Sequence, residues 1–246
     1  MFTQIEITTR CNYSCFYCAG RDMEQRDMDW SLFEDILGGL EGQGYRVSLQ
    51  GEGEPTLHPR FWDMVAAIQA KALVPYTITN GSRIDAERVA ANFRHIGISI
   101  DTLDAEEAER IGRVGLEKVL RNLDDLLALM ESNRIIIHTV SQGQNIDALR
   151  VFCKTKGVRH LVQPLQQKDD YAYRYRDRIV IQPRPLRYEC KYLERKHMRY
   201  FSIDGKEMPC CFIKNAEAFV SKEALREELA KKRVPEACRG CQQLSE

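Results

Sequence analysis

The chain has 246 residues and a formal net charge of zero, because 36 lysines and arginines balance 36 aspartates and glutamates. Hydrophobic residues make up 43% and charged residues 29%, which excludes a disordered tail and allows one large domain or a domain with a small appendage. The zero net charge removes the simplest electrostatic argument for a nucleic-acid or membrane-surface partner. Without a signal-peptide pattern or a long apolar stretch, we expect a cytoplasmic protein that uses neither partner.

Short apolar segments alternate with helical segments over residues 2–162. We expect strands at 2–8, 47–49, 76–79, 96–100, 134–140 and 158–162. We expect helices at 30–40, 60–71, 84–93 and 146–156, and a charged helical region over 105–131. This alternation predicts an α/β fold with a parallel sheet, either open or rolled into a partial barrel. Its functional residues should gather at the carboxyl ends of the strands.

The pattern changes after Pro164, where a polar stretch rich in arginine and tyrosine breaks the alternation. We therefore place a domain boundary near 165–185 and expect domains at 1–170 and 171–246. Residues 198–213 have the pattern of a hairpin that turns at Asp204-Gly205, and 222–232 that of a charged helix. The arginines and tyrosines from Tyr171 to Tyr188 could bind an anionic or sugar substrate, but such stretches are more often solvated linkers.

Nine cysteines form two groups near opposite ends of the chain, with Cys153 alone between them as an expected core residue. In a reducing compartment, such groups indicate metal binding or redox chemistry rather than disulfides. Cys11, Cys15 and Cys18 form a C-x3-C-x2-C loop directly after the first strand. Three thiolates can bind three irons of a [4Fe–4S] cube and leave the fourth iron open to a small molecule. A structural zinc site would need a fourth ligand, and the loop offers none.

This cysteine loop, with Tyr17 before its last cysteine, resembles the signature of the radical S-adenosylmethionine (SAM) superfamily. The resemblance implies a partial (β/α)6 barrel similar to a TIM barrel, and an open iron that binds the amino and carboxylate groups of SAM. It implies reductive cleavage of SAM to methionine and a 5′-deoxyadenosyl radical, which abstracts a substrate hydrogen. It also implies an external electron donor such as flavodoxin or ferredoxin.

A second segment, GEGEPTLHP at 51–59, is similar to the GGEP element with which the family contacts the SAM amino group. The matching residues are Gly53, Glu54 and Pro55, whereas Glu52 stands where the family has its first glycine. The departure puts any role of that position in doubt, while the placement behind a strand supports the match.

Two further matches follow from the resemblance. Ser99 and Asp101 end the fourth expected strand, where family members contact the SAM ribose, and Arg110 or Arg113 matches an arginine that pairs with the SAM carboxylate. A strand-end cap and a solvated helix face are the structural alternatives for these residues. Asn80-Gly81, with Thr79 before it, also matches a family element, although a simple turn is the favoured explanation.

The C-terminal cysteines resemble the Twitch module, a shortened SPASM domain, including its G-x4-C hairpin from Gly205 to Cys210. The resemblance implies a second, closed [4Fe–4S] cluster with four ligands: Cys190, Cys210, Cys238 and Cys241. Cys211 is a spare thiol that could replace Cys210. Four thiolates also suit structural zinc, so a non-catalytic zinc-binding scaffold remains an alternative.

A closed second cluster can accept an electron from a substrate radical, so the resemblance favours an oxidation of the dehydrogenase type. The precedent is 2-deoxy-scyllo-inosamine dehydrogenase, which has one auxiliary cluster. A maturase that cross-links or epimerises a ribosomal peptide is the alternative. Because the first expected strand begins at residue 2, we expect a small molecule or a peptide presented by a partner. His138, Tyr188 and Glu189 lie where a general base would act, but no pattern selects one of them.

Overall fold

The computed structural model of the chain describes residues 2–40, 46–165, 185–194 and 198–244. Its first part alternates strands and helices as expected. The strands are β1 (Phe2–Ile5), β2 (Arg46–Leu49), β3 (Val74–Thr79), β4 (Ile96–Ser99), β5 (Ile135–Ser141) and β6 (Arg159–Pro164). The helices are α1 (Trp30–Gly38), α2 (Phe61–Ala70), α3 (Ala86–Asn92), α4 (Ala105–Ile111), α5 (Leu116–Leu127) and α6 (Asp147–Lys156).

From residue 185 onward, the described residues add two strands and two helices to this arrangement. They are β7 (Met198–Phe201), β8 (Glu207–Met208), α8 (Lys191–Glu194) and α9 (Lys222–Ala230). Short 3-10 turns lie at Ala19–Asp22, Pro55–Leu57, Ser132–Arg134, Glu236–Cys238 and Gln242–Leu244. None of the helices in the described part of the chain is long and apolar enough to cross a membrane.

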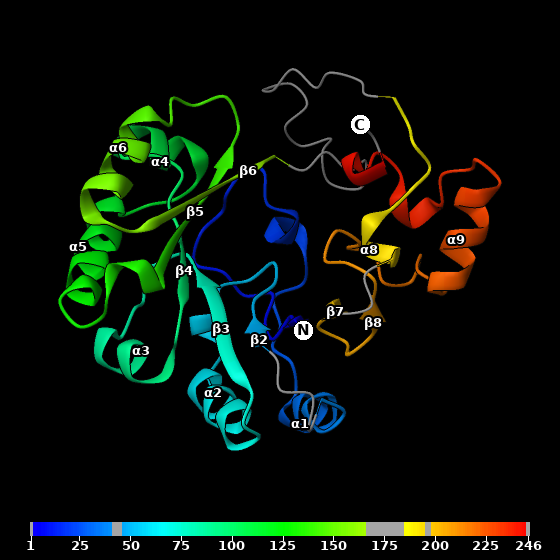
Figure 1. Cartoon of the computed structure of the whole chain (residues 1–246), viewed down its shortest axis with the longest axis horizontal. Coiled ribbons are helices and arrows are strands. Elements are labelled where there is room, and N and C mark those ends of the chain that lie inside the picture. The colour runs from blue at the N-terminus through cyan, green and yellow to red at the C-terminus, as the bar shows by residue number, and fades with distance from the viewer. Residues whose placement is uncertain (1, 41–45, 166–184, 195–197, 245–246) are drawn as a thin grey trace.

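The eight strands of the described residues form one sheet in the order β6-β5-β4-β3-β2-β1-β7-β8, and among these strands only the β7–β8 pair is antiparallel. The α/β class is therefore confirmed, with a mostly parallel sheet like that of a partial TIM-type barrel. Helices α1 to α6 lie along one curved side of this sheet (Figure 1). Alternate strand residues such as Ile5, Leu49 and Ile98 pack against these helices and are fully buried.

The hairpin expected over 198–213 is present and turns at Gly205, which has a positive φ of 73°. Its first strand, β7, pairs in parallel with β1, so that Ile5 lies opposite Phe201. The C-terminal segment is thus joined to the first strand of the sheet by main-chain hydrogen bonds. Figure 1 shows β7 and β8 beside the N-terminus, with α8 and α9 on the outer side of the hairpin.

The helical region expected over 105–131 is divided into α4 and α5. Gly112 ends α4 with a φ of 99°, and its N–H donates to the carbonyls of Ala108 and Glu109. A Cβ atom at Gly112 would lie 2.3 Å from the carbonyl oxygen of Ser14, so only glycine fits against the cysteine loop. The charged pattern predicted a helical region here but did not place the break at Gly112, because local periodicity does not report this long-range contact.

A second hydrophobic cluster, built from α8, α9, β7, β8 and the segments between them, supports the C-terminal part. Its buried members include Leu193, Tyr200, Met208, Phe219 and Leu225. Most of the arginine- and tyrosine-rich stretch and of the boundary expected near 165–185 lies outside the described residues.

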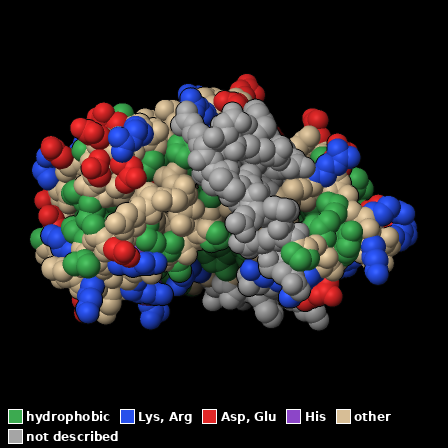
Figure 2. Space-filling model, turned by 90° about the horizontal axis from the view of Figure 1, so that it is seen from above, with side chains coloured by type: hydrophobic (Ala, Val, Ile, Leu, Met, Phe, Trp, Pro, Cys, Tyr) green, Lys and Arg blue, Asp and Glu red, His purple; other side chains and the backbone are tan. Residues whose placement is uncertain are grey.

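Positive and negative side chains are interspersed over the described part of the face shown in Figure 2.

Candidate functional site

The cysteine loop follows β1 and is held from across the sheet by the end of α4. The Ser14 N–H donates to the Gly112 carbonyl at 3.0 Å, and the Phe16 N–H donates to the Ile111 carbonyl at 2.9 Å. Within the loop, the Cys18 N–H donates to the Cys15 carbonyl at 3.0 Å. These backbone bonds fix the loop without using the thiols.

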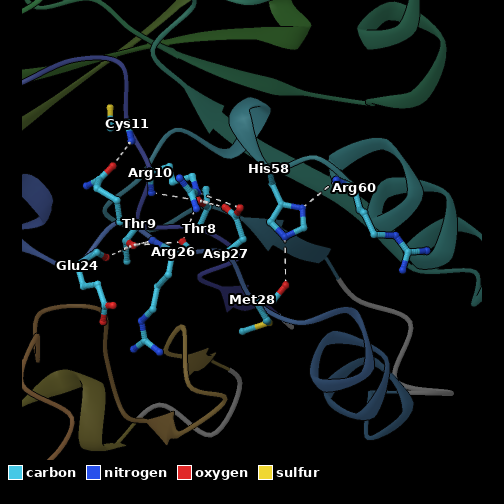
Figure 3. Close-up of polar contacts among 11 residues, drawn as sticks. Thr8, Thr9, Arg10, Cys11, Glu24, Arg26, Asp27, Met28, His58 and Arg60 are labelled. Atoms are coloured by element: carbon cyan, nitrogen blue, oxygen red, sulfur yellow. Dashed lines mark hydrogen bonds and ion pairs between the residues drawn. The ribbon is translucent and has the colours of Figure 1, made fainter.

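The residues before the first cysteine are fixed by the segment that precedes α1 (Figure 3). The Thr8 hydroxyl donates to Asp27 Oδ1 at 2.6 Å, and Arg10 Nε donates to Asp27 Oδ2 at 3.0 Å. The Cys11 N–H donates to Gln25 Oε1 at 3.1 Å. Asp27 therefore holds the entry to the cysteine loop with both of its carboxylate oxygens.

His58, the histidine nearest to the cysteine loop in sequence, serves this same framework. Its ring accepts the Arg60 N–H at Nδ1 (3.0 Å), so Nε2 carries the proton and donates to the Met28 carbonyl at 3.1 Å (Figure 3). Both ring nitrogens are used and the side chain is buried. His58 therefore acts as a structural bridge between the 51–59 segment and the start of α1.

The donor set of the loop fits an iron–sulfur cluster. Burial raises the pKa of the Cys11, Cys15 and Cys18 thiols, so each thiol keeps its proton unless a cation replaces it. Burial is the largest cause of the raised pKa of Cys18, and Glu52 and the other two thiols raise it further. The three sulfurs are therefore close enough to act on one another electrostatically. No three His, Cys, Asp or Glu side chains in the described ranges are grouped tightly enough for a single metal ion. A [4Fe–4S] cube instead takes one thiolate on each ligated iron, so three thiolates bind three separate irons.

Tyr17 connects the cysteine loop to the end of β4. Its hydroxyl donates to Asp101 Oδ2 at 2.5 Å and accepts from Arg113 Nη2 at 2.9 Å. Arg113 Nε lies 2.9 Å from Asp101 Oδ2, and the Asp101 side chain is only 1% exposed. Of the two arginines considered from the sequence, the structure brings Arg113 to Asp101. Arg110 is instead exposed on α4.

Next to this network lies a pocket at the carboxyl ends of β3 and β4. Its polar lining comprises Tyr13, Asn80, Ser99, Asp101, Thr102 and Arg113. Ile100, Leu116 and Val119 supply an apolar wall. Tyr13 belongs to the cysteine loop, so the pocket and the loop share a wall.

Glu54 of the GEGEP segment joins the ends of three strands. Its buried carboxylate accepts the Thr79 hydroxyl at 2.7 Å and the Asn80 N–H at 2.6 Å, while its own N–H donates to the Arg10 carbonyl at 2.7 Å. A Cβ atom at Gly53 would lie 2.4 Å from the Thr8 carbonyl oxygen, so the segment needs glycine there. The close approach at Gly53 and the hydrogen bonds of Glu54 thus hold the segment against the cysteine loop.

Glu52 is directed away from the pocket, toward the C-terminal part of the chain. Its Oε2 accepts the Gly20 N–H at 3.0 Å, and its Oε1 forms an ion pair with Lys214. Its N–H donates to Glu6 Oε1 at 2.8 Å. Sequence reasoning missed Glu6 and Lys214, and the only sign of them was the unusual glutamate at position 52.

The C-terminal cysteines gather in the second hydrophobic cluster. Cys210 is a buried member of the cluster, and Cys190, Cys211, Cys238 and Cys241 are partly buried and pack against the cluster. Burial raises the pKa of Cys210 to about 12, with further increases from Cys211, Cys241 and Cys190. Burial is also the largest cause of the raised pKa of Cys211, but the charges that act on this pKa come from Lys214, Glu52 and Glu6 rather than from other cysteines. The two adjacent thiols therefore have different surroundings.

Comparisons with known proteins agree with this architecture. The family model of the Radical SAM superfamily matches residues 5–155, which is more than half of the chain. GTP 3',8-cyclase from Chlorobaculum tepidum is 28% identical over 181 residues, covering 69% of this chain and 55% of the cyclase. Mycofactocin maturase MftC from Mycolicibacterium smegmatis is 29% identical over 155 residues, covering 60% of this chain and 39% of the maturase. The chain thus spans about half of the cyclase and less of the maturase.

Solved structures share the fold at low sequence identity. SuiB from Streptococcus suis bound to S-adenosylmethionine has a TM-score of 0.73 at 16% identity, covering 96% of this chain and 66% of SuiB. BtrN in complex with AdoMet and 2-DOIA has a TM-score of 0.56 at 15% identity, covering 99% of this chain and 90% of BtrN. The cysteine loop, the strand-end residues around it and the family match over residues 5–155 lead to one assignment. The chain belongs to the radical SAM superfamily.

Proposed function

We propose that Cys11, Cys15 and Cys18 bind a [4Fe–4S] cluster with one open iron, and that SAM occupies the pocket beside the loop. One observation carries this proposal: three thiols, one buried and two partly buried, lie in a loop that shares Tyr13 with a pocket at the strand ends. When bound, the cluster and SAM supply one-electron cleavage of SAM to a hydrogen-abstracting 5′-deoxyadenosyl radical. An external donor such as flavodoxin or ferredoxin would provide the electron.

The residues of the chain then position SAM and keep water from it. Asp101 is committed to Arg113, Tyr17 and the Val140 N–H, which donates to Asp101 Oδ1 at 2.8 Å. It therefore serves as the anchor that holds Arg113 and Tyr17 at the pocket. Arg113, rather than Arg110, is the arginine that we assign to SAM. Ser99 and Asn80 offer polar groups in the same pocket.

The GEGEP segment supports the pocket from the other side. The Gly53 backbone lies against Thr8 and Arg10, and the Glu54 carboxylate accepts four hydrogen bonds from Thr56, Thr79 and Asn80. Any contact of this segment with SAM, as assigned to Gly53, Glu54 and Pro55 by family resemblance, therefore falls to the main chain. The Glu54 side chain has a structural role and holds the segment in place through its hydrogen bonds.

A second, auxiliary cluster is proposed for Cys190, Cys210, Cys238 and Cys241 in a C-terminal domain. These residues share one hydrophobic cluster, and the pKa of Cys210 responds to Cys190 and Cys241. Cys211 is in the electrostatic environment of Lys214 and Glu52, so Cys210 is the better ligand. A ligand set of four thiolates closes this cluster to substrate.

For the substrate we propose a peptide, whose modification includes an oxidation assisted by the auxiliary cluster. SuiB bound to its precursor peptide SuiA has a TM-score of 0.71, at 16% identity over 99% of this chain and 70% of SuiB, above the value for BtrN. The similarity to the maturase MftC supports the same choice. Dehydrogenation of a small molecule is the second candidate, supported by the BtrN fold.

Iron analysis of protein purified without oxygen tests the cluster proposal. About eight irons per chain are expected from two four-iron clusters, and about four when Cys11, Cys15 and Cys18 become alanine. Replacing Cys190, Cys210, Cys238 and Cys241 should likewise leave about four. A colourless protein that contains zinc at either set would contradict the assignment and favour the zinc-binding scaffold.

A further inference from the structure

Glu52 occupies the position where the GGEP element has a glycine, and its carboxylate is only 14% exposed. Oε2 lies 3.6 Å from Cys18 Sγ and accepts the Gly20 N–H at 3.0 Å. A Cβ atom at Gly20 would lie 2.5 Å from Glu52 Cβ, so the glycine at position 20 permits this close approach. A carboxylate is therefore held beside one of the three thiols of the cysteine loop.

Lys214 reaches this carboxylate from the C-terminal cysteine segment. Its ammonium forms an ion pair with Glu52 Oε1 and donates to the Cys211 carbonyl at 2.6 Å. The Lys214 side chain is only 16% exposed. Between the Cys18 thiol and the Cys211 backbone there are therefore two side chains of opposite charge.

Contacts around the paired strands β1 and β7 hold Glu52 and Lys214 in place. Glu6, at the end of β1, accepts the Glu52 N–H at 2.8 Å through Oε1. Its other oxygen accepts the Tyr200 hydroxyl at 3.2 Å and the Ile203 N–H at 3.3 Å from the C-terminal hairpin. The β1–β7 pairing thus fixes Glu52 and the C-terminal segment in one register.

The charges in this pair are poorly solvated, so their effects on a neighbouring cluster are weakly screened. Burial acts to lower the pKa of Lys214, but Glu52, Tyr200, Cys211 and Glu6 together raise it well above its ordinary value. Lys214 is thus cationic. A carboxylate beside a cluster disfavours the addition of an electron, and a cation next to that carboxylate offsets this effect.

We propose that Glu52 and Lys214 are positioning residues that set the reduction potential of the SAM-binding cluster and couple it to the C-terminal cysteine segment. Lys214 holds the Glu52 carboxylate against Cys18 and balances its charge. The inference rests on the proposed function, because it requires a cluster at Cys11, Cys15 and Cys18. It assigns a role to a position where the chain departs from the family motif.

The test measures the midpoint potential of the SAM-binding cluster in Glu52→Gln, Lys214→Gln and the double variant. The electron paramagnetic resonance signal that changes when SAM is added reports this cluster and not a closed one. Glu52→Gln should shift the potential upward, because Lys214 is left unbalanced. Lys214→Gln should shift it downward, and the double variant should return close to the wild-type value.

Two control variants separate this effect from a general loss of structure. Glu207→Gln removes a carboxylate that pairs with Arg199 at 2.8 Å in the β7–β8 hairpin, and it should leave the potential unchanged. Lys214→Arg keeps the charge and should retain the wild-type potential. If Lys214→Gln does not fold, Lys214→Arg and Glu52→Gln still carry the test.

Shifts of the same sign in both single variants, or no shift in Glu52→Gln, would overturn the proposal. An equal shift in Glu207→Gln would do the same. If the wild-type protein shows no SAM-responsive signal and binds no iron at its first cysteine set, the proposed function itself fails. A normal signal in wild type without opposite shifts in the variants rejects only the role of this ion pair.

Discussion

Substituting Gly112 by alanine should remove the first cluster through the backbone, without touching a cysteine. Gly112 has a φ of 99°, and an added Cβ would lie 2.3 Å from the Ser14 carbonyl oxygen and 2.6 Å from its carbonyl carbon. Backbone atoms cannot swing aside as a flexible side chain can. The cysteine loop must therefore move away from α4, which breaks the bonds from Ser14 to Gly112 and from Phe16 to Ile111.

The size of the effect follows from these contacts. A non-glycine residue in the left-handed region costs about 1–2 kcal/mol. The loss of two backbone hydrogen bonds adds about 1 kcal/mol each, so Gly112→Ala should lower the free energy of unfolding by about 3–4 kcal/mol. Gly115 provides the matched control, because its φ is 75° and an added Cβ meets nothing within 4 Å. Gly115→Ala should therefore cost only the strain, about 1–2 kcal/mol.

Urea unfolding of the two variants measures the difference in stability, and iron analysis measures its consequence for the cluster. We expect Gly112→Ala to retain about four irons and Gly115→Ala about eight. Equal stabilities and equal iron contents would show that the contact between α4 and the cysteine loop does not shape the site.

Three further changes test other parts of the site. Asp101→Asn leaves the Arg113 guanidinium without its buried partner and should lower the free energy of unfolding by about 3 kcal/mol, measured by chemical denaturation. The control Asp147→Asn removes an exposed ion pair and should lower it by under about 1 kcal/mol. Similar losses in the two variants would refute the role of Asp101 as a buried partner. Cys211→Ser should keep about eight irons while Cys210→Ser should lose about four, and the reverse pattern would identify Cys211 as the ligand. Burial lowers the pKa of His138 to about 4, so the folded state favours the neutral ring. The contribution of this preference to stability is complete above about pH 6.5 and is lost as the pH falls toward 4. His138→Gln should reduce the acid loss of stability by up to about 3 kcal/mol, and an unchanged pH profile would contradict the effect.

Much of the fold could be predicted from the sequence because its signals are local. The alternation of short apolar runs with amphipathic segments predicted six parallel strands, and all six are present within a few residues of the expected bounds. The cysteine loop, the GEGEP segment and Asp101 follow β1, β2 and β4. Parallel strands bring their carboxyl ends together, so their convergence at one edge could also be inferred.

The remaining features depend on contacts between residues far apart in the chain. The pairing of β7 with β1 joins residues 2–5 to 198–201, and no periodicity reports such a partner. The choice between Arg110 and Arg113 depended on the break at Gly112, which is set by the approach of Ser14. The ion pair of Glu52 and Lys214 likewise joins two segments that only the folded chain brings together.

We infer that Cys11, Cys15 and Cys18 together enable the chain to cleave SAM. Its most direct test is to incubate the anaerobically purified protein with SAM and dithionite and to measure 5′-deoxyadenosine by mass spectrometry. The wild-type protein should form 5′-deoxyadenosine, and the variant with alanine at Cys11, Cys15 and Cys18 should form none. A fully iron-loaded wild-type protein that forms no 5′-deoxyadenosine, or equal product from the alanine variant, would contradict this role of the three cysteines.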